Sequence, residues 1–235
     1  MTNRWVSLGK PHPKGEPEVY TPFAWPDGCV RVFNDNPEPS FEASAISVAQ
    51  EVFQVIERRR SRKIFAPLTG NDLSELLRRS ARTLATAPSA LGFELEQRPA
   101  PSAGAIHPIH VLLKLPDEVE WCRYDSRSHA LIDCPGSGGL FEELSAEIET
   151  SLPSSSATKL LLVAEPGKTQ AKYNDASSLV WRDAGALLGI MAVIAEALSL
   201  HYSPLGITGD PWVSRLGPDG VFAGVGVAVV GRPES

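Results

Sequence analysis

The spacing of apolar residues predicts helices in several parts of the chain. From Ser44 to Arg58, valine and isoleucine recur every three or four residues, the period of an amphipathic helix. The segment DLSELLRRSART carries its leucines on one face, and Asn71 before it is a residue type that caps helix N-termini. Shorter helices are predicted at Gly139–Glu149 and Pro211–Leu216.

Other apolar runs predict strands. His110–Leu115 is one strand, and Trp121–Asp133 has the pattern of a hairpin whose turn lies near Asp125–Ser128. The continuous apolar run Lys159–Ala164 suits a strand buried on both faces. Val221–Val230 is also predicted as a buried strand, and its glycines indicate that another group approaches closely.

The predicted helix Ser177–Leu200 is apolar on nearly all sides. Ten large apolar residues surround it: Leu179, Val180, Trp181, Leu187, Leu188, Ile190, Met191, Val193, Ile194 and Leu198. A helix that is apolar all round must be buried all round. It is either the central helix of a monomer or a helix covered partly by its own domain and partly by a second subunit. We favour the second interpretation.

The predicted elements fall into one domain preceded by an arm. Residues 1–43 are rich in proline and polar residues and show no periodicity, so we expect an extended arm there. Residues 44–235 are then a single domain. The chain has 235 residues, 43% of them hydrophobic, which is enough to bury a core of this kind.

Composition argues against several classes of protein. The net charge of −6 is opposite to that of a typical nucleic-acid-binding protein. The three cysteines, Cys29, Cys122 and Cys134, form no C-x-x-C pair and are odd in number, so neither a disulfide framework nor a zinc site is expected. His107 and His110 are separated by two residues and would face opposite sides of a strand, which disfavours a metal site.

Nothing in the chain predicts a membrane protein. The first twenty residues contain no apolar stretch of the kind that a secretory signal needs. The most apolar segment, Ala184–Ala195, is too short to cross a bilayer and is flanked by charged residues. We therefore expect a cytoplasmic protein.

A basic run follows the first predicted helix. Five of the six residues Arg58–Lys63 are cations, with Ser61 among them. Close cations repel one another unless water or an anion lies between them. Arginine, lysine and serine together can hold a phosphate. A solvated basic helix end is the alternative, and from this segment alone it is the more favourable interpretation.

Three further segments are candidates for ligand binding, two through an accessible backbone and one through a charged side chain. The small-residue loop Pro101–Pro108 carries little bulk between two prolines, so a flat ligand can approach its backbone, although a simple connection has the same composition. Ser203–Gly206 is expected to present backbone amides with little side-chain cover. The final strand is followed by Arg232.

Taken in order, these segments resemble a known family. The succession RRSRKIF, PLT, PSAGAIHP, KY, an apolar helix, SPLG and VGRP is similar to the SagB-type azoline dehydrogenases of the FMN-dependent nitroreductase superfamily. The resemblance extends from about Val52 to Pro233. It implies an α+β fold, with a mixed sheet flanked by helices in an intertwined homodimer. It also implies two FMN molecules at the subunit interface.

The resemblance also implies roles for individual residues. The residues that match the phosphate-binding run are Arg59, Arg60, Ser61 and Lys63, together with Arg232 near the phosphate. Those that match the segments against the flavin are Ser102, Ala103, Gly104, Pro204, Leu205 and Gly206. Lys172 and Tyr173, the Lys-Tyr pair, match two residues that the family needs for ring oxidation.

The chemistry that the resemblance implies is removal of a hydride and a proton from an azoline ring. FMN takes the hydride, and a lysine whose pKa is lowered near the flavin is a competent base for the proton. The substrate would be a thiazoline or oxazoline in a modified peptide or related intermediate, with a cyclodehydratase complex as partner. His107 is a further candidate for contact with the substrate.

Two other functions remain open from the sequence. Family members often continue KYG-x-R, whereas this chain has Asn174 and Ala176 at the changed positions. The chain is therefore also compatible with an NAD(P)H-dependent nitro- or quinone-reductase. A non-catalytic subunit on the same scaffold is the third possibility.

Overall fold

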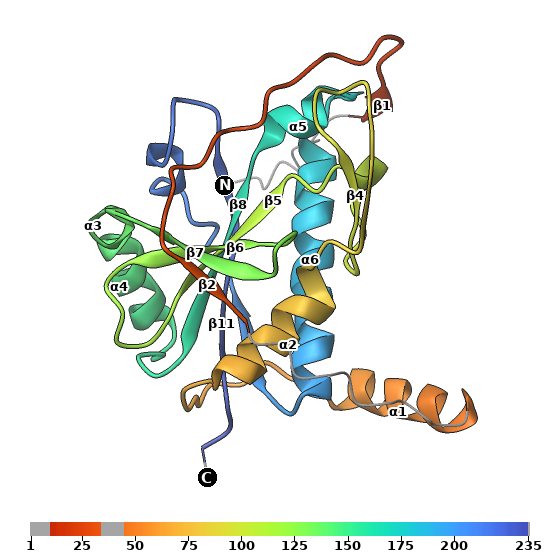
Figure 1. Ribbon diagram of the computed structural model, residues 1–235. Helices are drawn as coiled ribbons and strands as arrows, with labels where there is room; N and C mark the ends of the chain where they lie inside the picture. The colour runs from red at the N-terminus through yellow and green to blue at the C-terminus, as the bar shows by residue number, and fades with distance from the viewer. Residues whose placement is uncertain (1–9, 34–44, 235) are drawn as a thin grey trace, which may run out of the picture.

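The computed structural model of the chain describes residues 10–33 and 45–234. Its centre is a seven-stranded sheet in the order β10-β11-β8-β5-β6-β7-β2 (Figure 1). The strands are β2 Val30–Val32, β5 Ile109–Lys114, β6 Trp121–Asp125, β7 Ala130–Cys134, β8 Thr158–Ala164, β10 His201–Leu205 and β11 Ala223–Gly231.

Every neighbouring pair in this sheet is antiparallel. The mixed sheet implied by the resemblance is therefore wrong in this detail. The physical reason lies partly in the connections, because β5, β6 and β7 follow one another through short turns that reverse the chain. The α+β class and the arrangement of helices around a central sheet are confirmed.

Helices cover both faces of the sheet (Figure 1). The α-helices are α1 Ala45–Arg58, α2 Gly70–Ala81, α3 Ser137–Leu140, α4 Glu142–Ser151, α5 Pro166–Gln170 and α6 Ser177–Ala197. Two 3-10 turns occupy Ala103–Ala105 and Val213–Arg215. The helices α2 and α6 pack on one face and α4 on the other, so each face has its own apolar core.

Strand β8 explains why both faces must be covered. All seven of its residues are buried, which confirms the prediction from its continuous apolar run. Leu160 and Leu162 belong to the core under α2 and α6, whereas Leu161 and Val163 belong to the core under α4. Successive side chains of a strand point to opposite faces, so an apolar run supplies both cores at once.

Some predicted boundaries were wrong for local reasons. Helix α2 begins at Gly70, and its N-cap is Thr69, not Asn71. The Thr69 hydroxyl accepts a bond of 3.2 Å from the Asp72 amide, and the Asp72 carboxylate accepts one of 2.9 Å from the Thr69 amide. This reciprocal capping box outcompetes a single cap at the next polar residue. The segment predicted as one helix at 139–149 is divided into α3 and α4 at Phe141.

Several strands were missed. Ser203–Leu205, for which only accessible backbone amides were expected, lies in edge strand β10, where Ser203 pairs with Val229 and Leu205 with Val227. The hairpin of β3 (Ala85–Ala87) and β4 (Leu95–Gln97) also has no strong strand signature, since alanine is a weak strand former. The segment predicted as a helix at 211–216 contains only the turn Val213–Arg215.

The described part of the N-terminal arm crosses the domain in an extended form. Strand β1 (His12–Pro13) pairs with β9 (Tyr173–Asn174), and β2 forms the edge of the central sheet. Glu165, fully buried, accepts hydrogen bonds from the Tyr20 hydroxyl at 2.9 Å and the Phe23 amide at 2.6 Å. A buried carboxylate needs such donors, so it ties the arm to the sheet.

Helix α6 is buried on one side and open on the other. Trp181 is 42% exposed, and Gly185 and Gly189 are exposed on the same stretch of helix. Among the described helices, α6 is long and apolar enough to cross a membrane, whereas its central segment Ala184–Ala195 alone is too short. The other side of α6 packs on the sheet and belongs to the core.

Candidate functional site

The small-residue loop and the Lys-Tyr pair meet at Gly104. A Cβ atom built on Gly104 would lie 2.8 Å from the Tyr173 hydroxyl and 2.9 Å from Lys172 Nζ. The backbone of Gly104 is left-handed, with φ of 64°. Glycine meets both demands because it has no side chain and adopts this conformation without strain. Two segments that are nearly seventy residues apart thus form one site.

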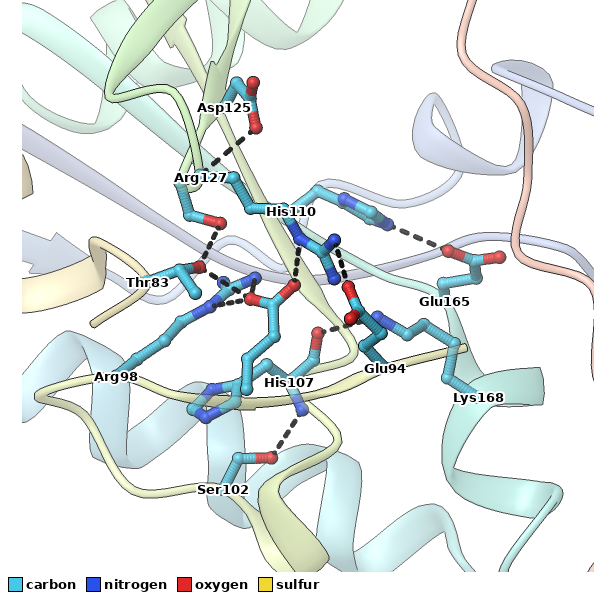
Figure 2. A network of polar contacts seen from close by, with 12 residues as sticks. Thr83, Glu94, Arg98, Ser102, His107, His110, Asp125, Arg127, Glu165 and Lys168 are labelled. Atoms are coloured by element: carbon cyan, nitrogen blue, oxygen red, sulfur yellow. Dashed lines mark hydrogen bonds and ion pairs between the residues drawn. The ribbon is translucent and has the colours of Figure 1, made fainter. Parts of the chain in front are cut away.

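Asp183 of α6 holds the small-residue loop in place. The Ser102 hydroxyl donates to its carboxylate at 2.5 Å, and the Ala103 amide donates at 3.1 Å. Ser102 Oγ in turn accepts the His107 amide at 2.9 Å (Figure 2). Burial raises the pKa of Asp183, while the two donors act in the opposite direction. The role of Asp183 is not predicted from the motifs, although a lone carboxylate in an apolar helix is a signal for such a role.

The N-terminal arm lies against the Lys-Tyr pair. The Lys14 amide donates to the Lys172 carbonyl at 2.9 Å, and Pro13 is opposite Tyr173 in the β1–β9 ladder. Lys172 Nζ lies 5.6 Å from the centre of the Tyr173 ring, and both residues are half-buried. The pair is therefore held from behind by the arm and faces the small-residue loop.

The basic run lies near the other end of α6. Arg62 Nη2 is 3.6 Å from Glu196, and the Arg62 amide donates to the Tyr202 carbonyl at 3.2 Å. Arg60 donates to the backbone carbonyls of Glu57 and Arg59. Within the described residues, Arg59 and Lys63 form no ion pair, so their charges are available to an anion.

Arg232 joins the basic run through the backbone. Ala66 and Arg232 exchange two backbone hydrogen bonds of 2.8 Å, which places the last strand beside the segment that follows Lys63. The Arg232 guanidinium lies 3.3 Å from Asp72. The structure thus places the backbone of Arg232 three residues beyond the end of the basic run, at Ala66.

The third segment expected near the flavin, Pro204–Gly206, lies beside the middle of α6. Leu205 pairs with Val227. The neighbour of Val227, Gly226, faces Leu188, because a Cβ on this glycine would lie 3.1 Å from the Leu188 side chain. Pro204 and Gly206 are exposed at this edge of the sheet.

One chain does not bring the two halves of the predicted site together. The small-residue loop contacts α6 at Asp183, and the basic run contacts it at Glu196. Thirteen residues of helix separate these contacts, which corresponds to about 20 Å. The loop and the Lys-Tyr pair form one group, and the basic run and Arg232 form the other.

His107 is a buried part of the small-residue loop. Its ring is buried, and burial together with the charge of Arg98 lowers its pKa to about 4. It also lines a pocket of about 440 Å³ between the loop and the β3–β4 hairpin. No group of three or more histidine, cysteine or acidic side chains in the described part of the chain is arranged to hold a metal ion.

Comparison with known proteins shows the fold. No protein family profile matches the sequence, and no curated protein matches it significantly. The solved structures that resemble the chain include a protein from Ralstonia eutropha described as a nitroreductase, with TM-score 0.62 and 20% identity over 96% of this chain and 99% of that one.

Two other solved structures are informative. The Escherichia coli microcin synthetase McbBCD complex, with truncated pro-microcin B17 bound, contains a chain that matches with TM-score 0.52 and 16% identity, over 87% of this chain and 79% of that one. A Desulfovibrio desulfuricans protein described as a nitroreductase in complex with FMN matches with TM-score 0.50 and 18% identity, over 78% and 87%. The chain therefore has the nitroreductase fold.

Proposed function

We propose that the protein is an FMN-dependent dehydrogenase that oxidises azoline rings. The observation that carries this proposal is the contact of Lys172 Nζ and Tyr173 Oη with Gly104 in the small-residue loop. The proposal takes Lys172 as the base, and the contact supports it because the segment around Gly104 is the one that resembles the flavin loop of the family. The similarity of the fold to an FMN complex and to a microcin synthetase subunit supports the same function.

The residues present fit FMN in two respects. Arg59 and Lys63, without ion pairs among the described residues, are donors suited to a phosphate group, and the backbone bridge from Ala66 to Arg232 brings a third cation to the segment that follows them. At the other group, Ala103, Gly104 and Ala105 carry at most a methyl side chain and are only half-buried, so a flat ring can approach the backbone of the small-residue loop. Both features are properties of this chain, apart from any family resemblance.

A shared site in a homodimer accounts for the separation of these two groups. If two copies pair through α6 with the helices antiparallel, the loop of one subunit approaches the basic run of the other. Gly185 and Gly189 on the exposed side of α6 would allow a close approach. Helix α1, which projects from the body beside α6 in Figure 1, exposes Phe53 and Ile56 that a partner would cover.

The division of labour follows from the chemistry of the ring. Converting an azoline to an azole removes a hydride from one ring atom and a proton from its neighbour, and a double bond forms between them. When bound, FMN supplies the hydride acceptor. Lys172 Nζ takes the proton, and the Tyr173 hydroxyl orients the ring or relays that proton. Asp183 positions the loop through Ser102 and Ala103.

An anaerobic reduction experiment tests the proposal. The purified protein should carry FMN, and its flavin absorption should bleach when a thiazoline-containing peptide is added, with formation of the thiazole measured by mass spectrometry. The same peptide with thiazole in place of thiazoline is the matched control. No bleaching by the thiazoline peptide, with rapid bleaching by NADPH, would assign the protein to the reductases instead.

The reductase is the second candidate because the neighbour from Ralstonia eutropha is described as a nitroreductase. Purification without any flavin would favour a non-catalytic subunit. A cyclodehydratase partner is part of the proposal, supported by the similarity to a chain of a synthetase complex. Co-purification with a cyclodehydratase encoded beside this protein would test that partner directly.

A further inference from the structure

A second cavity of about 160 Å³ lies behind the small-residue loop and is rich in cations. Four cationic side chains line it: Arg98, Arg123, Arg127 and Lys168. Figure 2 shows three of them arriving from different segments, Arg98 after β4, Arg127 from the β6–β7 turn and Lys168 from α5. Only two carboxylates, Glu96 and Asp125, line the same cavity, so positive charge is in excess.

Glu96 forms ion pairs with two of the four cations, and one of these, Arg127, also pairs with Glu94 at 2.7 Å. The Glu96 carboxylate lies 2.5 Å from the Arg98 guanidinium and 2.8 Å from Arg127 Nε. Burial disfavours ionisation of Glu96, but these arginines and the Thr83 hydroxyl outweigh it and lower its pKa to about 2. Glu96 is therefore ionised, and its two arginines form a fixed wall of the cavity.

The Lys168 ammonium group has hydrogen-bond donors that no described residue accepts. It is 9% exposed, and its ammonium group donates to the His107 carbonyl at 3.3 Å and lies 5.0 Å from the Phe93 ring centre. An ammonium has three donors, and this one is taken out of water with a single long hydrogen bond. Burial lowers its pKa accordingly.

Arg123 has no acceptor within the described part of the chain. Its guanidinium is half-buried and stacks on the Trp25 ring at 5.4 Å. Burial lowers its pKa as well. A half-buried cation with neither ion pair nor hydrogen bond among the described residues is costly, and an anion in the cavity that Lys168 and Arg123 both line would offset part of that cost.

We propose that this cavity binds the carboxylate group of a small organic molecule. A carboxylate accepts paired hydrogen bonds from arginine and further bonds from lysine. It carries a single negative charge, and Glu96 and Asp125 repel it less than they would repel a doubly charged phosphate. The site uses no residue of the Lys-Tyr pair or of the basic run.

The position of the cavity indicates which molecule carries the carboxylate. Glu96, Arg98 and His107 line both this cavity and the pocket of about 440 Å³ beside Ser102 and Ala105. A ligand anchored by its carboxylate therefore extends toward the small-residue loop. This step rests on the proposed function. The substrate is then a molecule with a free carboxylate close to the oxidised ring, either a small acid or a peptide in which the ring lies next to the C-terminal carboxylate.

Calorimetric titration of the purified full chain with benzoate tests the anion site without any turnover. Benzamide, which has the same shape and no charge, is the control ligand. Benzoate should bind and benzamide should not. Lys168→Met and Arg123→Gln should each weaken benzoate binding by about tenfold or more, the usual effect of a lost charge-assisted hydrogen bond. Lys159→Met is the matched control protein, since Lys159 is 8% exposed but does not line the cavity.

Several outcomes would overturn the proposal. One is that benzamide binds as tightly as benzoate. Another is that Lys168→Met and Arg123→Gln both fold and bind benzoate with unchanged affinity. A third is that inorganic phosphate binds more tightly than benzoate. Thermal unfolding identifies a variant that fails to fold. The benzoate affinity of the other variant then tests the proposal. If the variants lose affinity for FMN but not for riboflavin, the cavity holds the cofactor's phosphate, and the proposal is wrong. Benzoate binding by a protein that oxidises no azoline would reject the proposed function alone.

Discussion

At the scale of single residues, the site depends on contacts between groups that are far apart in the sequence. Gly104 leaves room for the Lys-Tyr pair, and Asp183 holds the loop that contains this glycine. Gly104 and the pair are predictable from the sequence because they lie in recognisable segments. The roles of Asp183, Glu96 and Lys168 are not, because they arise only when the fold brings distant segments together.

The first prediction concerns the Lys-Tyr pair. Lys172→Ala and Tyr173→Phe should each lower turnover of a thiazoline peptide by about 10²–10⁴-fold, the usual contribution of a general acid or base. Flavin content, measured by absorbance, should stay at the level of the unaltered protein, and dithionite should still reduce the flavin. Lys10→Ala is the control, since Lys10 is exposed. Loss of FMN from both variants would show that the pair is structural.

The second prediction concerns pH and His107. Its pKa falls from an ordinary value of about 6.5 to about 4 in the folded state, because burial and Arg98 disfavour the charged ring. The neutral ring stabilises the fold fully above about pH 6.5, and this contribution is lost as the pH falls through about 4. Its size is at most about 3 kcal/mol.

Urea unfolding at pH 7 and pH 4 measures this contribution. Between these values, the free energy of unfolding should fall more for the unaltered protein than for His107→Asn. Asparagine does not titrate, and it tolerates the left-handed backbone of this position, where φ is 48°. Glu96 keeps its charge in the folded state at pH 4, because its pKa is about 2, and its protonation in the unfolded chain is common to both proteins. Equal losses in the two proteins would contradict the assigned pKa.

At the scale of helices and strands, the elements that could be predicted from the sequence are those with the strongest apolar pattern. Strand β8 and helix α6 were predictable because their apolar runs are continuous and long. Strand β10 contains a proline and follows α6 closely, and β3 is the sequence Ala-Thr-Ala, so local preference indicates no strand in either. These strands form because neighbouring segments offer backbone partners, which no local pattern reveals.

The third prediction belongs to the basic run after α1. The double variant Arg59→Ala/Lys63→Ala should bind FMN about 100-fold more weakly or worse, because each charge-assisted phosphate contact contributes about 1.5–3 kcal/mol. Fluorescence titration of the flavin-free protein measures the affinity. Arg215→Ala, another exposed arginine, is the control and should bind normally. Riboflavin, which lacks the phosphate, should bind the double variant and the unaltered protein alike.

At the scale of the whole molecule, the basic run and the Lys-Tyr pair lie at different places along α6. The proposed homodimer can therefore be tested by mixing two variants, each defective in one of these groups. The protein Arg59→Ala/Lys63→Ala lacks the phosphate group of the site, and Lys172→Ala lacks the base. If each site takes these groups from different subunits, a mixed dimer has one site with both groups intact and one with neither.

The fourth prediction is therefore recovery of activity on mixing. Two proteins that are each nearly inactive should together regain about a quarter of the unaltered activity, since random pairing makes half of the dimers mixed and each has one good site of two. Turnover is measured after subunit exchange at equal concentrations. Lys172→Ala mixed with Tyr173→Phe is the control and should recover nothing. Absence of recovery in the first mixture, despite proven exchange, would place both groups in one chain.

The arm that backs the Lys-Tyr pair has a consequence for how the protein is made. His12 pairs with Asn174, so the strand partner of this early segment is synthesised 162 residues later. At about 5–20 residues per second, a ribosome needs roughly 10–30 s to reach it. During that time the arm has no β9 to pair with, and Glu165, its buried anchor, has not been made either. The strand that lies behind the proposed base is therefore among the last parts of a newborn chain to reach its place.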